Sequence, residues 1–447
     1  MGPDGTILYV PDPFSPVLMI SERGDTPTAV TALDNMNGQG GHRWPSHVDE
    51  RHFLFTVQAA RPELTGVYLA NLDSRAVSRL VPQYSNAAFV DGQLLYVADG
   101  MIVARPLDPA RATVGEAMEV AGAVAYTTGL GFTAFSVASN ILAFAPGSGE
   151  ASPTSRMQWF DRSGKPLEQL GAGSDLSSLN SYYQRISPDG RKVAVSAFQS
   201  ATADLWLVDT ARNVSSRFTF NDATEFSPVW SPDGTEVVYA SNRGGFHNMY
   251  AQSVTKPGDE RRLAEAASNQ YPTDWSPNGR TIIYTNLDPK TQADIWTMPA
   301  GGGEQTPLIV TGFNEYAARL SPDGQLVAYT SDESGRPEVY VQRYPSGREK
   351  TRVSAQGGSE PQWRADGREL YFLTPNRRLN VVSVTTTPTL FAARPVKIFE
   401  VVVDTSIGSI HSWHFAPSAD GQRFLLDVSS TTASTSTVVL NWRSGER

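Results

Sequence analysis

Polar and ionisable side chains recur at one position of a repeating unit in this chain. Each repeat has a bulky residue just before a tight turn, and the residue five places earlier is polar in several repeats. These residues are Ser181, Glu225, Gln270 and Glu315, with Gly358 in the next repeat and His411 near the equivalent place in the last. Tyr183, Tyr271 and Glu360 fall within two residues of this set. We expect the set to form one ligand-binding site.

Carboxylates and an imidazole that face one opening could hold a divalent cation, a cationic ligand or a basic peptide end. A metal centre would use Glu225, Glu315 and His411, and His42 joins them because it occupies the same place in an N-terminal repeat. The six histidines include no HExxH pair, so the ligands would have to come from different repeats. No cofactor is expected beyond such a cation, calcium or manganese. The alternative interpretation is a solvated polar lining that binds nothing.

The repeat itself is marked by turns of the type "SPDG". The Ser of the turn stands at 187, 231, 276 and 321, and Arg364 and Ser418 are its equivalents, which gives spacings of 44, 45, 45, 43 and 54 residues. Pro presets φ, Asp bonds back to the local backbone, and Gly accepts the positive φ of a tight hairpin. The Asp is therefore expected to serve a turn, because catalysis needs one such residue and every repeat has one.

A period near forty residues with four strands per period is typical of β-propeller blades. We count about ten repeats and predict an all-β protein of four-stranded antiparallel blades. Four degenerate repeats, the first without its innermost strand, form an N-terminal propeller portion over 1–172, and six regular repeats form a propeller over 173–447. A single ten-bladed ring is the alternative.

Composition narrows the class of function. The 37 basic and 46 acidic residues give a formal charge of −9 without long runs of one sign, so nucleic acid is not an expected partner. The chain has no cysteine, which excludes disulfides and thiolate chemistry. No stretch approaches the roughly 18 apolar residues of a membrane helix, and the N-terminus lacks the pattern of a signal peptide. We therefore expect neither membrane insertion nor an export signal in this chain.

The repeats resemble those of TolB-like propellers, and more specifically the C-terminal sensor region of bacterial Ser/Thr protein kinases. The stretches that carry the resemblance include "RWPSHVDERHFLF", "MQWFDRSGKPLEQLG", "PVWSPDGTEVVYASNRGG", "LSPDGQLVAYTSDESGRPEVYVQRYP" and "GGSEPQWRADGRELYF". The chain has no Gly-rich loop with a strand lysine, no His-Arg-Asp and no Asp-Phe-Gly, so no kinase domain is present. The resemblance implies an extracytoplasmic sensor region that starts late in the family's first propeller.

The function expected from these features is non-catalytic binding at the propeller mouth. The partner would be a peptide, a protein or a small polar ligand, and an unclosed N-terminal blade edge could also pair two copies into a homodimer. The alternative is a metal-dependent hydrolase or lyase that acts on phosphoesters, lactones or acidic sugars, with a divalent cation in the funnel.

Overall fold

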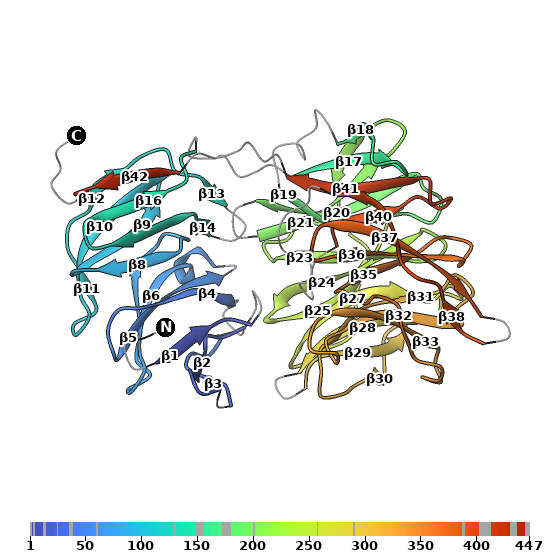
Figure 1. The fold of residues 1–447 in the computed structure, drawn as a ribbon, viewed down its shortest axis with the longest axis horizontal. Helices are drawn as coiled ribbons and strands as arrows, with labels where there is room; N and C mark the ends of the chain where they lie inside the picture. The colour runs from blue at the N-terminus through green and yellow to red at the C-terminus, as the bar shows by residue number, and fades with distance from the viewer. Residues whose placement is uncertain are drawn as a thin grey trace. The chain divides into compact units, whose positions relative to one another are not determined.

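The computed structural model is built almost entirely of antiparallel β-sheet (Figure 1). It describes residue 2 and residues 5–11, 15–24, 26–34, 39–59, 61–127, 131–147, 155–171, 180–199, 202–256, 258–288, 291–386, 389–401, 413–429 and 436–442. The chain divides into two compact units, the first made of 1–153, 199–202 and 431–447 and the second of 154–198 and 203–430. Among these described residues, no helix combines the length and hydropathy that a bilayer crossing would require.

The second unit is a β-propeller, and its described strands form six sheets, named here blades 1 to 6. Blade 1 is β19 (Asn180–Ile186), β20 (Lys192–Gln199), β21 (Thr202–Asp209) and β22 (Val214–Arg217); blade 2 is β23 (Glu225–Trp230), β24 (Glu236–Gly244), β25 (Phe246–Ser253) and β26 (Glu260–Arg262); blade 3 is β27 (Asn269–Trp275), β28 (Thr281–Asp288), β29 (Gln292–Pro299) and β30 (Thr306–Ile309); blade 4 is β31 (Glu315–Leu320), β32 (Leu326–Ser331), β33 (Glu338–Arg343) and β34 (Thr351–Arg352); blade 5 is β35 (Ser359–Trp363), β36 (Glu369–Thr374), β37 (Arg378–Thr385), β38 (Phe391–Ala392) and β39 (Val396–Glu400); blade 6 is β40 (Phe415–Pro417), β41 (Arg423–Ser429), β17 (Ser155–Asp161) and β18 (Pro166–Leu170).

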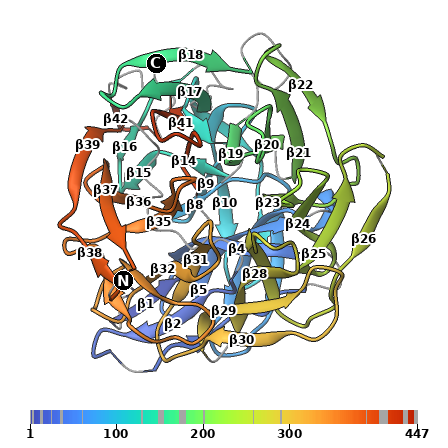
Figure 2. The same cartoon turned by 90° about the vertical axis from the view of Figure 1, so that its right-hand side faces the viewer.

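Blade 6 joins two distant parts of the chain. Its inner strands β40 and β41 come from the C-terminal end of the unit, whereas β17 and β18 come from before blade 1, and β17 pairs with β41 from Ser155↔Ser429 to Asp161↔Arg423. Strand β40 contacts both β35 of blade 5 and β19 of blade 1, so the blades follow one another around a closed circuit. Figure 2 shows β18, β22, β26 and β30 around the rim and β19, β23, β31 and β35 nearer the middle.

The first unit contains the degenerate repeats. Its described strands form a three-stranded sheet of β1 (Thr6–Tyr9), β2 (Leu18–Ser21) and β3 (Thr28–Ala29); a sheet of β4 (Gln39–His47), β5 (His52–Ala59), β6 (Gly66–Asn71) and β7 (Val77–Val81), with the 3-10 turn η2 (Pro62–Leu64); a sheet of β8 (Ala87–Val90), β9 (Gln93–Ala98), β10 (Met101–Asp108), β11 (Thr113–Val114) and β12 (Met118–Ala121); the pair β13 (Tyr126–Thr127) and β14 (Phe132–Thr133); and a sheet of β15 (Phe135–Ala138), β16 (Ile141–Phe144) and β42 (Thr437–Leu440). The first sheet has three described strands, and the expected loss of its innermost strand stays a prediction.

Two segments belong to a different unit from the one that the predicted boundary at 172/173 assigns to them. Strands β17 and β18 precede the boundary but complete blade 6 of the second unit. Strand β42 follows it but pairs with β16 of the first unit, as Figure 1 shows with the red strand beside the teal one. The repeat pattern could not show this exchange, because a strand's sequence indicates which face it buries and not which neighbour it pairs with.

The apolar core of the propeller lies between adjacent blades. Tyr239 of blade 2 is fully buried in a cluster with Ala194, Leu205 and Leu207 of blade 1, and Tyr329 of blade 4 packs in the same way against blade 3. Burying a side chain of this size contributes about 1.5–3 kcal/mol. The bulky residue before the turn also spans the gap, since the indole nitrogen of Trp230 donates to the carbonyl of Arg185 at 2.9 Å.

The "SPDG" segments are hairpin turns, as predicted. In the second blade Gly234 has φ +71°, its amide donates to the carbonyl of Ser231, and the Ser231 hydroxyl donates to Asp233 at 2.6 Å. Asp233 also accepts from the amide of Thr235 at 3.0 Å. The turns of neighbouring blades touch, because a Cβ at Gly234 would lie 3.8 Å from Pro188 of the preceding turn.

The inner strands of blades 1 to 5 each contain a β-bulge near their middle. The register with the second strand shifts between Tyr182 and Arg185 in blade 1, and shifts at the same place in blades 2 to 5. In four of these blades a residue of the bulge has positive φ although it is not glycine: Tyr183 (62°), Ser227 (57°), Ala317 (56°) and Glu360 (59°). A bulge re-aims the side chains that follow it. In this ring it sets the direction of the residue just before the bulky pre-turn residue.

The turn geometry predicts different outcomes for two adjacent substitutions. Gly234→Val should lower the free energy of unfolding by about 1–3 kcal/mol, because a β-branched residue is strained at this φ. Asp233→Asn should change it by less than about 1 kcal/mol, because an amide oxygen still accepts from Ser231 and Thr235. Urea unfolding followed by circular dichroism measures both. Equal losses in the two variants would contradict this account of the turn.

Candidate functional site

Charged side chains from several blades meet at the middle of the propeller. The residue just before the pre-turn residue is Arg185 in blade 1, Asp274 in blade 3, Arg319 in blade 4 and Gln362 in blade 5, and all four hold the same register against the second strand of their blade. Together with Glu360, Trp413 and His414, the three charged residues Arg185, Asp274 and Arg319 form what we call the central cluster.

Trp413 is the surface on which the two arginines meet. The guanidinium carbon of Arg185 lies 3.8 Å from the centre of the Trp413 ring, and that of Arg319 lies 5.9 Å away. Stacking of a guanidinium on an indole is favourable because the ring face carries negative charge. The indole therefore holds two cations from blades on different sides of the ring within one buried site.

The two carboxylates of the central cluster are already bound by neighbouring groups. Asp274 accepts from the amide of Leu320 at 2.7 Å and forms an ion pair with Arg319 at 3.3 Å. Burial raises the pKa of Asp274, against the opposing effect of Arg319. Glu360 accepts from the amide of His414 at 2.7 Å, and its other oxygen lies 2.7 Å from Nδ1 of the same residue. Glu360 was a predicted site residue, and the structure places it in the bulge of β35, against His414.

Three of the predicted mouth residues are fully buried against their own blades. Glu225 and Glu315 begin the inner strands of blades 2 and 4, and Gln270 begins that of blade 3 one residue after Asn269, and none of the three is exposed. Gln270 donates to Gln305 at 2.5 Å. These side chains therefore do not line an open mouth. Counting back from the pre-turn residue located the inner strands correctly. It could not distinguish a side chain that faces the propeller axis from one that is buried within its blade.

Glu225 and Glu315 have different partners. Glu225 accepts from Arg243 at 2.5 Å and from Ser241 at 3.2 Å, and a second carboxylate, Glu260, accepts from Arg243 at 2.7 Å. Glu315 accepts from Thr311 at 2.7 Å and from Ser331 at 3.1 Å. Burial raises the pKa of both glutamates, and for Glu225 the nearby arginine opposes the rise. The predicted repulsion across a mouth is replaced by separate hydrogen bonding within each blade.

The two predicted tyrosines are brought together by a phenylalanine. The ring of Phe226 stacks between Tyr183 at 5.4 Å and Tyr271 at 5.3 Å, and His247 packs against Phe226 at 4.8 Å. All four side chains are buried. Burial lowers the pKa of His247 to about 3, so this histidine is neutral in the folded protein at pH 7. The stack is a packing element between blades 1 to 3.

The remaining predicted residues do not join the central cluster in the described structure. His411 lies outside the described residues, and for Ser181 only the backbone is described. A Cβ at Gly358 would come within 2.8 Å of Ser354, so this position is closely packed. In the first unit, His42 is buried, lies 2.7 Å from Thr31 and has its pKa lowered to about 4 by burial. Among the described residues, no group of three His, Asp or Glu side chains is arranged to hold a metal ion.

Five residues of the central cluster were missed from the sequence: Arg185, Asp274, Arg319, Trp413 and His414. A signal for the first three was present. A charged residue stands directly before the bulky pre-turn residue in "YQRIS", "PTDWS" and "AARLS", near the end of an innermost strand that neighbouring blades cover. Charged groups at such positions are expected only where they meet partners. Trp413 carried no such signal, because it lies outside the turn pattern.

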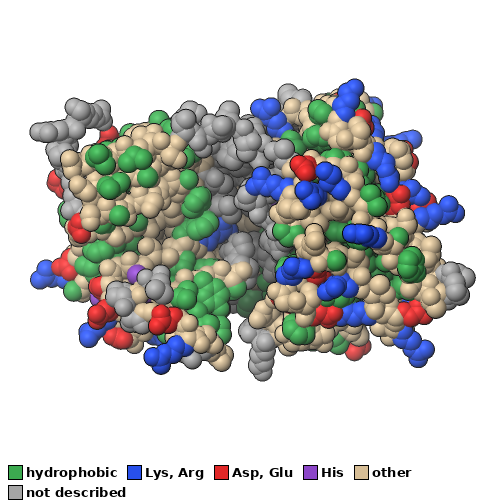
Figure 3. Space-filling model, viewed as in Figure 1, with side chains coloured by type: hydrophobic (Ala, Val, Ile, Leu, Met, Phe, Trp, Pro, Cys, Tyr) green, Lys and Arg blue, Asp and Glu red, His purple; other side chains and the backbone are tan. Residues whose placement is uncertain are grey.

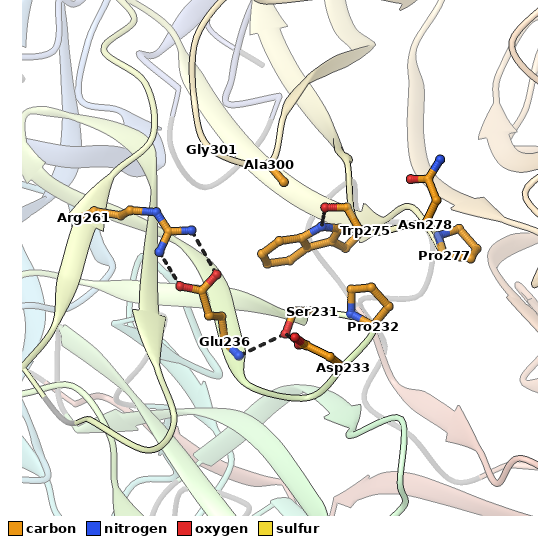
Figure 4. Close-up of a pocket in the computed structure, with 11 residues that line it drawn as sticks. Ser231, Pro232, Asp233, Glu236, Arg261, Trp275, Pro277, Asn278, Ala300 and Gly301 are labelled. Atoms are coloured by element: carbon orange, nitrogen blue, oxygen red, sulfur yellow. Dashed lines mark hydrogen bonds and ion pairs between the residues drawn. The ribbon is translucent and has the colours of Figure 1, made fainter.

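A groove lies between the turns of blades 2 and 3, and Figure 4 shows its lining. This groove has a volume of about 560 Å³. Its polar side chains are bonded to each other, because Arg261 forms a bidentate ion pair with Glu236, Ser231 donates to Asp233 and Ser276 donates to Asn278. On the face drawn in Figure 3, basic and acidic side chains are interspersed over the propeller strands and do not gather into a patch of one sign. The central cluster is therefore the stronger candidate.

A closed ring of antiparallel blades defines the β-propeller class of binding and catalytic domains. In this class the inner strands bring side chains from different blades to a common centre. Residues 178–315 match the family described as the TolB beta propeller domain. The Tol-Pal system protein TolB of Helicobacter pylori is 25% identical over 104 residues, which are 23% of this chain and 24% of that protein. An uncharacterised protein of Agrobacterium fabrum is 26% identical over 95 residues, which are 21% of this chain and 32% of that protein.

Among solved structures, a putative TolB from Agrobacterium tumefaciens superposes with a TM-score of 0.50 at 19% identity, over 62% of this chain and 99% of that one. The matched part of this chain spans about a quarter of the length of the curated TolB. The chain thus contains a TolB-like β-propeller. The finer resemblance to kinase sensor regions stays a prediction.

The different bonding of the two buried glutamates predicts different responses to the same substitution. Glu225→Gln should lower the free energy of unfolding by about 1–3 kcal/mol, because Arg243 loses its buried carboxylate and keeps only the exposed Glu260. Glu315→Gln should leave it unchanged within about 1 kcal/mol or raise it, because an amide oxygen still accepts from Thr311 and Ser331 while a buried charge is removed. Chemical denaturation of the two variants tests this, and a larger loss for Glu315→Gln would contradict the assignment.

The buried neutral His247 predicts a component of acid sensitivity. Its pKa falls from 6.5 in the unfolded chain to about 3 in the folded protein, so below pH 6.5 the unfolded state binds more protons and stability falls as pH falls. The loss from this residue should reach about 2 kcal/mol at pH 5. His247→Phe should remove it, which makes the difference in stability between variant and parent depend on pH. A difference that is constant from pH 7 to pH 5 would show that His247 is not neutral and buried.

Proposed function

We propose that this protein is a non-catalytic binding module whose TolB-like propeller takes a peptide or protein partner at the central cluster. The observation that carries the proposal is the convergence of Arg185, Arg319 and Trp413 from blades 1, 4 and 6. A side chain inserted among them would contact three blades at once. Specific binding sites are typically built from a few polar groups that converge in this way beside an aromatic surface.

The bonding of the carboxylates favours binding over catalysis. A general base must be free to accept a proton from the substrate or its attacking water. Asp274 is engaged by Arg319 and by a backbone amide, and both oxygens of Glu360 face His414. Carboxylates held in this way shape and neutralise a site. They are poorly suited to activate water, which is what the hydrolase or lyase alternative would require.

A protein or peptide partner is favoured by two further features. Phe220 is 69% exposed and Phe313 is 47% exposed, and they lie on the loops that lead into the inner strands β23 and β31. Exposed aromatic side chains are enriched where proteins bind each other. The curated relative is named as a protein of the Tol-Pal system, which also favours a protein partner. The resemblance to sensor regions favours a location outside the cytoplasm.

Selection of peptides from a phage-displayed library on the full chain tests the proposal. The selected peptides should bind Arg319→Met at least tenfold more weakly than the parent, because this change removes one of the two cations stacked on Trp413. Arg423→Met is the matched control, since Arg423 of blade 6 pairs with Glu168 and also stacks on an aromatic ring, that of Trp159. It should bind as the parent does. Equal binding by the parent and Arg319→Met would overturn the central site, and so would a selection that yields no binder.

A further inference from the structure

Arg185 is a buried cation with one bare edge. The residue is 5% exposed, and its Nη1 donates to the carbonyl of Gln184 at 3.4 Å. Its Nε and Nη2 are both buried and have no hydrogen-bond partner. These two nitrogens lie on the same edge of the guanidinium, and their N–H groups point in parallel. A buried charged donor without an acceptor is costly, so this edge is expected to meet an acceptor in the functional state.

The bare edge matches a carboxylate. Parallel N–H groups on one side of a guanidinium donate to the two oxygens of a carboxylate in a bidentate pair, which is among the strongest polar contacts in proteins. Stacking on Trp413 occupies the face of the guanidinium and leaves the edge in its plane available. The geometry therefore fits a planar anion that approaches in the plane of the guanidinium, edge-on to the indole.

A further unsatisfied donor lies at the same level of the ring. Gln362 holds the register position of Arg185 in blade 5, is buried, and its Nε2 has no hydrogen-bond partner. Two residues on one level that both lack an acceptor point to an anion between blades. Solvent reaches this level of the ring, because 21% of the Arg319 side chain is exposed.

The charges around Arg185 favour a singly charged ligand. Arg319, Asp274 and Glu360 are the charged groups that act on it, and the fourth titratable group of the central cluster is His414. With neutral His414, the two arginines and the two carboxylates balance. A carboxylate adds one negative charge to this balance, whereas a phosphate adds nearly two beside Asp274 and Glu360. Repulsion from these groups disfavours the doubly charged anion.

We infer that the centre of the propeller binds a carboxylate of the peptide partner, with Nε and Nη2 of Arg185 donating to its two oxygens. This inference rests on the proposed function and names the chemical group that is recognised. The group is either the C-terminal carboxylate of the partner or an Asp or Glu side chain.

Thermal melting of the full chain with small probes at constant ionic strength tests the inference. N-acetyl-dialanine carries a terminal carboxylate, and N-acetylglutamate with an amidated α-carboxyl group carries only the side-chain carboxylate. At least one of them should raise the melting temperature by mass action, and which one does so identifies the source. N-acetyl-dialanine amide should not raise it. Stabilisation by inorganic phosphate but not by either carboxylate would overturn the inference.

Substitutions assign the effect to Arg185. Arg185→Met should abolish the shift and leave the melting temperature without probe unchanged or higher, because buried N–H groups without an acceptor are removed. Arg185→Lys retains the charge without the paired edge and should lose most of the shift. Arg191→Met, an exposed arginine in a turn of the same blade, should respond as the parent does. A full response in Arg185→Met would overturn the inference. Library peptides that bind equally well after their carboxylates are amidated would also overturn it, while leaving the binding function intact.

Discussion

The second unit depends on the pairing of β17 with β41. Seven residue pairs from Ser155↔Ser429 to Asp161↔Arg423 join the beginning of the unit to its end. Without them, blade 6 would consist of β40 and β41 alone, and β41 would expose an unpaired sheet edge next to blade 1. Closure removes that edge and fixes the distance between opposite blades. The central cluster requires this closure, because Arg185 of blade 1 stacks on Trp413, which lies on the segment that leads into blade 6.

The bulges convert a regular ring into a ring with a polar centre. In an unbroken strand, side chains alternate strictly between the two faces of a blade, and both faces are covered by neighbouring blades. The extra residue in the inner strands of blades 1 to 5 changes this alternation near the middle of each strand. The aromatic stack of Tyr183, Phe226 and Tyr271 involves residues up to and within the bulge, and Arg185 follows the bulge of its strand, as Asp274 and Arg319 do in theirs. Apolar packing and ligand recognition are in this way separated along the axis.

The fold followed from the sequence more fully than the site did. The turns of type "SPDG" recur with a local signature, and the four strands of the repeat that begins at Glu225 lie where their alternation placed them. Glu225 and Glu315 were selected by counting, yet each is buried within its own blade. Residue counting carries no information on a bulge that shifts register by one. The partner strand of β17 and the contact of Arg185 with Trp413 depend on chain closure, which joins residues more than two hundred positions apart.

The order of the strands makes the propeller an insertion within the first unit. The chain leaves the first unit before β17, completes the ring and returns to pair β42 with β16. Because Ser155 and Ser429 are register partners, the two ends of the propeller segment lie next to each other. A segment with adjacent ends can be excised or transplanted as one piece, whereas a cut at 172/173 would divide a blade. The segment from β17 to β41 is thus the piece of this chain that can be moved as a whole, and the segments before and after it pair with each other through β16 and β42.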